Sequence, residues 1–210
     1  MPRYLITCSN SKIEPKGHPN SKPSSIEELS FNNELGKIRN SLINKVLLQY
    51  NHFNFDWNNT LPAWQLYSGP HSTIFKRINQ RCWENPNTDV LIFSTVFGWV
   101  KHTDRLPHYS LGLDRSLIID DSGSNGCIDG FWSMPPIQNK IHHIIDPQND
   151  IDLLSDKYRR HFFKRNQLIA QSPGVEFTDN WGHSKGDYLF EKLGGWQDLL
   201  EETELMDIEI

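Results

Sequence analysis

The sequence has little cysteine, no stretch typical of a leader and no long apolar run. Its three cysteines, Cys8, Cys82 and Cys127, include no CxxC pair, and an odd number argues against a disulfide framework. The apolar run at residues 4–7 is too short for the hydrophobic region of a signal peptide. No run approaches the length of a membrane span. We therefore expect free thiols and a cytoplasmic protein that does not contact a membrane.

An excess of positive charge is also missing. The 21 Lys and Arg residues against 26 Asp and Glu residues give a formal net charge of -5. Proteins that bind nucleic acid through their overall field are basic, so any such contact must come from a local patch. Metal-ligand spacing is absent too, because His142 and His143 are adjacent and His102 and His108 are six apart. We expect neither a metal nor a cofactor.

The chain does have enough apolar and aromatic material for a folded core. Hydrophobic residues make up 37% and aromatic residues 11%, with seven tryptophans, which excludes a disordered chain. Strand-like and helix-like patterns alternate in the first half, which predicts an α/β fold with a central, mostly parallel or mixed sheet flanked by helices. The predicted elements are strands at 3–8 and 89–95, a short strand within 61–67, and helices at 34–50 and 71–83.

The second half is predicted to be mostly helical. We expect a single domain over residues 1–210, with a core at about 1–115 and a turn-rich excursion plus C-terminal helices at about 116–210. The expected helices lie at 136–145, 150–171, 187–193 and 196–205.

The first candidate for chemistry is the end of the first strand. There Cys8, Ser9, Ser11 and Lys12 place a thiol, two hydroxyls and an ammonium group within five residues. Ligands of α/β proteins bind where strands end. A lysine near a thiol favours the reactive thiolate or holds an anion. The alternative is a buried cysteine that ends a strand beside a polar loop.

The second candidate is the segment Leu66-Tyr67-Ser68-Gly69, which precedes a predicted helix. A strand that ends at Ser68-Gly69 is suited to holding a phosphate or a base. The alternative is an ordinary turn that caps a helix.

The third candidate follows the strand at 89–95, which is the clearest in the chain. It comprises Ser94, Gly98, Asp104 and Tyr109, with a predicted loop at 97–104. Asp104 could act as a base or hold a ribose or base edge, and Tyr109 could stack or donate a hydrogen bond. The alternative is that Asp104 caps a turn and Tyr109 belongs to the core.

A basic face on the predicted helix at 150–171 is the strongest positive patch. Lys157, Arg160 and Lys164 lie on it and are candidate contacts to a DNA backbone. The alternative is a solvated helix surface.

These segments, in this order, resemble the YaaA-like (DUF328-related) superfamily. The similarity rests on Ser9-Asn10-Ser11-Lys12, on Leu66-Tyr67-Ser68-Gly69 and on Ser94 through Gly98 and Asp104 to Tyr109, and it covers about residues 1–110. The short chain and the cysteine before Ser9 make it most similar to the DpdC branch of 7-deazaguanine DNA-modification systems. Lys185, in Ser184-Lys185-Gly186, stands where relatives carry an Arg-Gly pair.

The resemblance to that branch implies an enzyme that converts the nitrile of a 7-cyano-7-deazaguanine base in DNA to the amide. Cys8 would add to the nitrile carbon, and Lys12 would favour the thiolate or protonate the nitrogen. Asp104 would be the general base, and Tyr67 and Tyr109 would orient the base. In a second scheme Cys8 is a bystander, and Lys12 with Asp104 activates water directly. The expected substrate contacts are Ser9, Ser11, Tyr67, Ser68, Gly69, Ser94, Gly98, Tyr109 and Lys185.

The expected partners are DNA that contains a modified base and other proteins of deazaguanine insertion. Two other functions remain open. One is a DNA-binding stress-protection protein without turnover, which is what the peroxide-stress members of the superfamily suggest. The other is a nucleoside or DNA-base glycosidase or exchanger, in which Asp104 would stabilise positive charge on the sugar.

Overall fold

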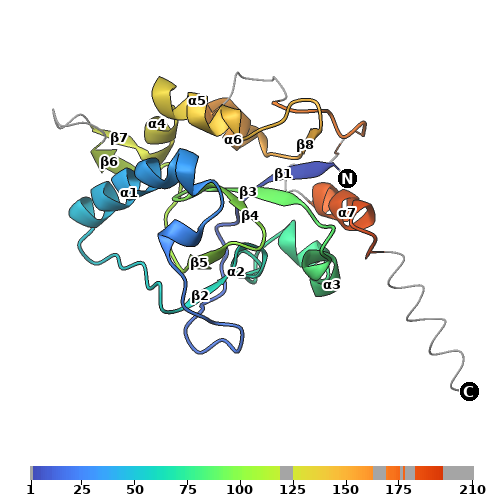
Figure 1. Cartoon of the computed structure of the whole chain (residues 1–210), viewed down its shortest axis with the longest axis horizontal. Helices are drawn as coiled ribbons and strands as arrows, with labels where there is room; N and C mark the ends of the chain where they lie inside the picture. Colours follow the sequence, from blue (N-terminus) through green and yellow to red (C-terminus); the bar gives the residue numbers. More distant parts are fainter. Residues whose placement is uncertain (1, 119–124, 163–168, 176, 178–182, 196–210) are drawn as a thin grey trace, which may run out of the picture.

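The computed structural model describes residues 2–118, 125–162, 169–175, 177 and 183–195. Its centre is a four-stranded sheet with the strand order β4-β3-β1-β8. The two strands beside β1 run parallel to it, and β4 runs antiparallel to β3. This confirms the predicted α/β class with a mixed central sheet (Figure 1). The strands are β1 (Arg3–Thr7), β3 (Val90–Ser94), β4 (Gly98–Lys101) and β8 (Asp150–Asp152).

Helices lie on both sides of this sheet, which explains why β1 and β3 are apolar on both faces. All residues of β3 are buried, and so are the last four of β1. Figure 1 shows α4, α5 and α6 on one side of the sheet and α2 and α3 on the other. The helices are α1 (Asn32–Gln49), α2 (Ala63–Leu66), α3 (Gln80–Glu84), α4 (Ile128–Trp132), α5 (Pro135–His143), α6 (Asp156–Phe162) and α7 (His183–Lys192), with 3₁₀ turns η1 (Ile26–Glu28) and η2 (Phe75–Arg77).

The longest helix among the described residues, α1, confirms the prediction for residues 34–50. It carries a fully buried arginine, Arg39, whose Nε donates to the carbonyl oxygen of Phe97 at 2.8 Å. Its Nη2 donates to the carbonyl oxygen of Trp99 at 2.7 Å. These bonds tie α1 to the chain that follows β3. The buried apolar face of α1 consists of Leu35, Leu42, Ile43 and Val46.

The short strand predicted within 61–67 is present at the beginning of that segment, and a helical turn follows it. The strand β2 (Thr60–Pro62) pairs antiparallel with β5 (Arg105–Pro107), and the chain then turns directly into α2. The backbone N–H of Ala63 donates to the carbonyl oxygen of Asp104 at 2.8 Å. The first turn of α2 thus finds an acceptor in a distant loop, which no local pattern reveals.

The predicted helix at 71–83 is interrupted, because η2 and α3 are separated by extended backbone at Ile78 (ψ 123°). The side chain of Asn79 accepts a hydrogen bond from the backbone N–H of Cys82 at 2.8 Å. Asparagine is a favourable first cap, so a separate helix begins there.

The predicted loop at 97–104 is also wrong, because it contains β4. Gly98 forms the turn from β3 into β4 with φ +63°, a conformation that glycine adopts without a steric cost. A Cβ atom at this position would lie 2.8 Å from the ring of Trp132. The chain therefore returns along β3 toward the beginning of that strand.

The predicted long helix at 150–171 is wrong as well. Its first residues form β8, and among the described residues of this range only those of α6 are helical. The carboxylate of Asp150 accepts from Arg3 Nη2 at 2.6 Å, and that of Asp152 accepts from Arg159 Nε at 3.0 Å. Both carboxylates are buried and paired, so the loss of either arginine would leave an uncompensated buried charge.

The rest of the second half contains elements of the predicted types, but their boundaries differ from the predicted ones. Helix α5 confirms the prediction at 136–145, and α7 begins earlier than the predicted 187–193. The turn-rich excursion contains the hairpin of β6 (Ser116–Ile118) and β7 (Asn125–Cys127). Residues 163–168 and the predicted helix at 196–205 lie outside the described residues.

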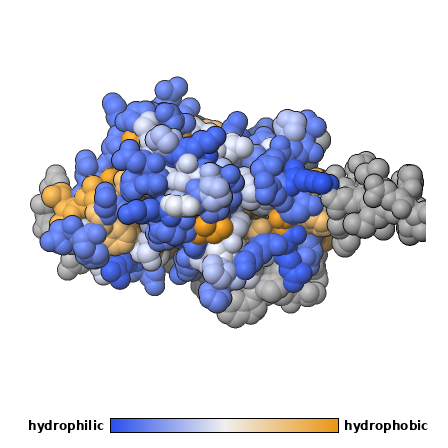
Figure 2. Space-filling model, turned by 90° about the horizontal axis from the view of Figure 1, so that it is seen from below, coloured by the Kyte–Doolittle hydropathy of each residue, from blue (hydrophilic) through white to orange (hydrophobic). Residues whose placement is uncertain are grey.

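Most of the face in Figure 2 is hydrophilic, with apolar surface at the end of the molecule where α1 and β6 lie. Leu48 at the end of α1 and Ile118 at the end of β6 are exposed there. Among the helices of the described ranges, none combines the length and the apolar character that crossing a bilayer requires.

Candidate active site

The parallel strands β1, β3 and β8 end at the same edge of the sheet, and polar side chains meet there. Cys8 follows β1, and its Sγ atom lies 3.4 Å from Thr95 Oγ1, just past the end of β3. The same sulfur lies 3.1 Å from the hydroxyl of Tyr158, in the helix that follows β8. The two hydroxyls are 3.3 Å apart. The strand register produces this contact, because Thr7 stands opposite Phe93.

A second group of hydroxyls lies beside the first. The hydroxyl of Tyr109 is 2.6 Å from that of Tyr67 and 2.8 Å from Ser94 Oγ, which accepts from the backbone N–H of Phe97 at 3.1 Å. Lys12 covers both tyrosines, with its Nζ 4.4 Å from the ring centroid of Tyr109 and 5.6 Å from that of Tyr67. An ammonium group at these distances is attracted by the ring faces.

Burial controls the protonation of these groups. It lowers the pKa of Lys12, and charge on Cys8 opposes this change, so the ammonium and the thiol are electrostatically coupled. Burial also raises the pKa of Tyr67, Tyr109 and Tyr158 well above the usual value, and charge on Cys8 adds to each shift. The three phenols therefore remain neutral hydrogen-bond donors.

The loop after β1 is held by the loop after α2. The backbone N–H of Ile13 donates to the carbonyl oxygen of Leu66 at 2.8 Å, and the N–H of His71 donates to Ser11 Oγ at 3.0 Å. Within the first loop, the N–H of Ser11 donates to Ser9 Oγ at 3.1 Å. The two predicted serines thus shape the loop that carries Lys12.

Gly69 makes this close approach possible. A Cβ atom at Gly69 would lie 2.5 Å from the backbone nitrogen of Lys12 and 2.5 Å from the carbonyl carbon of Ser11. Any other residue would push the two loops apart.

Cys8 borders a cavity of about 210 Å³, formed by residues 7–10 and residues 71–75. One wall carries Ser72, whose buried hydroxyl has no hydrogen-bond partner in the part of the chain that the structure describes. Cys8 itself is partly exposed. The thiol residue thus lies at a cavity and not in the sealed core.

Three other predicted contacts, Ser68, Gly98 and Lys185, lie outside this cluster. Ser68 Oγ donates to the carbonyl oxygen of Trp64 at 2.6 Å, and Gly98 packs against the core behind β3. Lys185 lies at the same sheet edge as Cys8, because its Nζ donates at 2.7 Å to the carbonyl oxygen of Leu154, two residues after β8.

The structure does not bring Asp104 to this edge. Its carboxylate accepts from the N–H and the hydroxyl of Ser30, at 3.0 and 2.7 Å, and from the N–H of Lys101 at 3.0 Å. Lys101 pairs with Leu91 at the start of β3, whereas Cys8 lies past the end of that strand. A strand of this length separates the two places by about 13 Å at roughly 3.3 Å per residue. Burial raises the pKa of Asp104, and its hydrogen bonds partly offset the shift.

This placement gives a direct prediction for Asp104→Ala. Since the change removes the acceptor of three hydrogen bonds in a partly buried turn, we expect it to lower the free energy of unfolding by about 2–4 kcal/mol. Urea denaturation measures this. Ser30→Ala, which removes only the hydroxyl bond, should cost about 1 kcal/mol. Equal stability of Asp104→Ala and the unchanged protein would contradict the structural role.

The predicted DNA contacts are only partly described. Lys157 is exposed on α6, next to Tyr158. Arg160 belongs to the same helix, and Lys164 lies outside the described residues. The neighbouring Arg159 is neutralised by Asp152 and Asp156.

Two residues of the site escaped the sequence interpretation. They are Tyr158 and Ser72, which are not among the predicted site residues. Nothing in the local pattern distinguishes a core tyrosine from one that contacts a thiol, or a serine at a turn from one that lines a cavity. Within the described ranges, no group of three or more His, Cys, Asp or Glu residues could hold a metal ion.

A thiol, an ammonium group and phenols at the carboxyl edge of parallel strands define an α/β protein with a candidate active site at that edge. A model of the family described as peroxide stress protein YaaA matches residues 22–190, and the chain belongs to this family. A search of curated proteins finds no significant match. The match confirms the YaaA-like resemblance. It begins after Cys8 and Lys12 and concerns the family as a whole, so the similarity to the DpdC branch stays a prediction.

Proposed function

We propose that the protein is an enzyme that hydrates the nitrile of a 7-cyano-7-deazaguanine base in DNA to the amide, with Cys8 as the nucleophile. The observation that carries the proposal is the environment of Cys8. Its sulfur contacts the hydroxyls of Thr95 and Tyr158, it is coupled to the Lys12 ammonium, and the residue lies at a cavity. A nucleophilic sulfur beside proton donors is what addition to a nitrile requires.

The first half of the proposed reaction forms a covalent intermediate. The sulfur of Cys8 attacks the nitrile carbon, a carbon–sulfur bond forms, and one π bond of the nitrile breaks. The thiol proton reaches the nitrile nitrogen through Lys12 or Tyr158, which gives a thioimidate.

The second half regenerates the thiol. Water adds to the thioimidate carbon, and one of its protons moves to the nitrogen, which becomes an amino group. The carbon–sulfur bond then breaks, and the remaining hydroxyl proton returns to the sulfur. The product is the amide, so one nitrile and one water are consumed and the enzyme is unchanged.

The other residues of the cluster support Lys12 and the sulfur in this scheme. The lowered pKa of Lys12 increases its fraction as a neutral amine, which can both accept and return a proton. Tyr67 and Tyr109 hold the Lys12 side chain over their rings and, being buried, have no free face for a base. Ser72 lines the cavity beside Cys8, and its buried hydroxyl has no partner among the described residues. Asp104 takes no chemical step.

DNA would meet the exposed side of this edge. Lys157 beside Tyr158 is a suitable phosphate contact, and the reacting base would have to leave the helical stack to reach Cys8. Proteins that insert the deazaguanine base would act before this step and are the expected partners.

The proposal is tested with the purified protein and an oligonucleotide that contains one 7-cyano-7-deazaguanine, with a guanine oligonucleotide as the control. Mass spectrometry of the digested nucleosides should show conversion to a product heavier by one water. Intact-protein mass spectrometry after acid quench should show a covalent adduct on Cys8.

Other outcomes identify the competing functions. Binding of the oligonucleotide with an unchanged nucleoside would favour a DNA-binding protein without turnover and would overturn the proposal. Release of the free base would identify a glycosidase instead. Formation of the carboxylic acid would show that ammonia, rather than the thiol, leaves the intermediate.

A further inference from the structure

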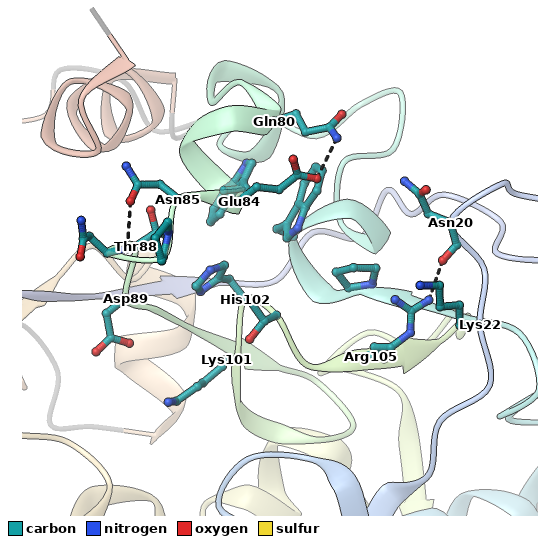
Figure 3. A pocket seen from close by; sticks show the side chains of 16 residues that line it. Asn20, Lys22, Gln80, Glu84, Asn85, Thr88, Asp89, Lys101, His102 and Arg105 are labelled. Carbon is teal, nitrogen blue, oxygen red and sulfur yellow. Dashed lines mark hydrogen bonds between the residues drawn. The ribbon is translucent and has the colours of Figure 1, made fainter. Parts of the chain in front are cut away.

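A second and larger cavity, of about 770 Å³, lies at the opposite end of β3 from Cys8. Its walls come mainly from residues 83–89, before that strand, and from residues 101–103 and Arg105, after β3 (Figure 3). The N–H of His102 donates to the carbonyl oxygen of Val90, the first residue of β3, which places this wall at the start of the strand. The volume is in the range of small-molecule sites. Nothing in the proposed nitrile chemistry uses this cavity.

The aromatic floor of the cavity is closed to a ligand. Trp83 is 1% exposed, and its ring is stacked between those of Trp64 and Phe75, whose centroids lie 6.2 and 5.8 Å away. His102 beside it is also buried. A bound molecule must therefore make its contacts at the rim of the cavity, where the exposed side chains are mostly polar.

One end of the rim presents a guanidinium group in a fixed position. Arg105 donates from Nη2 to the carbonyl oxygens of Asn20 and Thr60, both at 2.6 Å, and from Nε to Thr60 Oγ1 at 3.2 Å. All three acceptors are uncharged, and burial lowers the pKa of Arg105 with no carboxylate to oppose the shift. The two N–H groups of Nη1 have no acceptor in the part of the chain that the structure describes. Arg105 is thus held in place while its charge stays uncompensated.

Lys22 brings a second cation to the same end. Its backbone N–H donates at 3.2 Å to the carbonyl oxygen of Thr60, which also accepts from Arg105. Figure 3 shows the side chains of Lys22 and Arg105 next to each other at the cavity. No carboxylate in the described ranges forms an ion pair with either residue. Two adjacent cations without a counter-charge, one of them rigidly placed, favour an oxyanion as the ligand group.

The rest of the lining restricts the ligand to one anionic end. Glu84 Oε1 accepts from Gln80 Nε2 at 2.7 Å, which leaves Gln80 Oε1 and Glu84 Oε2 without a partner among the described residues. Asp89 lies at the end of the cavity away from Arg105 (Figure 3). A nucleic-acid strand carries phosphates along its whole length, so Glu84 and Asp89 would repel it. A ligand with one terminal oxyanion and a body of hydrogen-bond donors matches both parts of the lining.

We propose that this cavity binds a small sugar phosphate. Its phosphate would contact Arg105 Nη1 and Lys22 Nζ, and hydroxyl groups of the sugar would donate to Gln80 Oε1 and Glu84 Oε2. Hydroxyl donors suit these two acceptors, and a phosphate monoester carries nearly two negative charges for the two cations. The site is independent of the proposed reaction at Cys8.

The test is isothermal titration calorimetry of the whole protein with ribose 5-phosphate and glucose 6-phosphate, and with ribose, glucose and inorganic phosphate for comparison. We expect saturable binding of one molecule per chain for at least one of the two sugar phosphates. Inorganic phosphate should bind at least tenfold more weakly, and the unphosphorylated sugars should show no measurable binding. Loss of one phosphate contact in Lys22→Gln should weaken binding of the sugar phosphate about tenfold.

Matched variants separate the specific site from general electrostatics. Lys22→Arg keeps the charge and should keep the affinity. Lys16→Gln removes an exposed lysine of the same loop that lies outside the cavity, so it should bind normally. Gln80→Ala removes only a contact to the sugar, so it should weaken the sugar phosphate about threefold and leave the binding of inorganic phosphate unchanged.

Several results would overturn the proposal. These are the absence of binding for both sugar phosphates, or equal loss of affinity in Lys16→Gln and Lys22→Gln. Equal affinity for inorganic phosphate and the sugar phosphates would show a general anion site only. Binding of a single-stranded oligonucleotide that depends on Lys22, with none for the sugar phosphates, would assign the cavity to a nucleic-acid strand instead.

Discussion

Replacing Cys8 by alanine is expected to lower the rate of amide formation by about 10³-fold or more, because the proposed reaction then has no nucleophile. The free energy of unfolding should change by less than about 1 kcal/mol, since the thiol is partly exposed and its contacts are those of a weak hydrogen-bonding group. Single-turnover kinetics with the modified oligonucleotide measures the first quantity, and urea denaturation measures the second.

The variant Cys8→Ser distinguishes the covalent scheme from direct activation of water more sharply than Cys8→Ala does. A hydroxyl in Cys8→Ser can keep the contacts to Thr95 and Tyr158 but is a far weaker nucleophile toward a nitrile. We expect this variant to be folded, to bind the oligonucleotide and to form no adduct. Full activity in Cys8→Ser would exclude the covalent scheme and would leave direct activation of water by Lys12.

The matched control is Cys127→Ser. Cys127 is also a free, partly exposed cysteine, but its thiol contacts the carboxylate of Asp129, remote from the cluster. Its pKa is raised, first by that hydrogen bond and then by burial. We expect normal turnover in this variant, which shows that a loss in the Cys8 variants is specific.

The parts of the fold that follow from local pattern were predictable. The strands at 3–8 and 89–95 are continuous apolar runs, and α1 has a clear helical spacing. The strand at 150–152 was not predictable, because Asp150 and Asp152 become buried only through Arg3 and Arg159, which are distant in sequence or in an adjacent helix. Two buried carboxylates in a strand have no local signature.

The same distinction applies to the candidate site. Cys8, Lys12, Tyr67, Ser94 and Tyr109 were all expected near strand ends, and the structure brings them together. For Cys8, Lys12 and Ser94, which lie at or after the ends of β1 and β3, this convergence follows from a general rule, since parallel strands end at a common edge. Tyr67 follows α2 and Tyr109 follows β5 of the second sheet, so that rule does not place them.

The positions of Asp104 and Tyr158 do not follow from that rule. Asp104 lies only ten residues after Ser94 in sequence, but the β3–β4 hairpin carries it back to the other end of the sheet. Tyr158 lies far from Cys8 in sequence and reaches it through a strand that the pattern had read as helix. The first error concerns the direction of the chain after a strand, and the second concerns a short strand with buried charges; composition encodes neither.

The second large effect is expected for Gly69→Ala. Because the added methyl carbon would lie 2.5 Å from backbone atoms of Ser11 and Lys12, neither a rotamer change nor a small side-chain shift can accommodate it. The loop that carries Lys12 must move away from α2. Overpacking of this kind costs about 1–3 kcal/mol of stability, and a displacement near 1 Å at a reacting group costs about 10²-fold in rate.

The expected result for Gly69→Ala is therefore a folded protein with a moderately lower melting temperature and amide formation reduced by about 10²-fold. Gly36→Ala is the control, because the nearest atoms there belong to the Asn32 side chain, which can turn away, and alanine favours a helix. It should have normal activity and unchanged or higher stability. Normal turnover in Gly69→Ala would show that the position of Lys12 does not limit the reaction, and it would remove Lys12 from the proposed chemistry while leaving Cys8 to be tested separately.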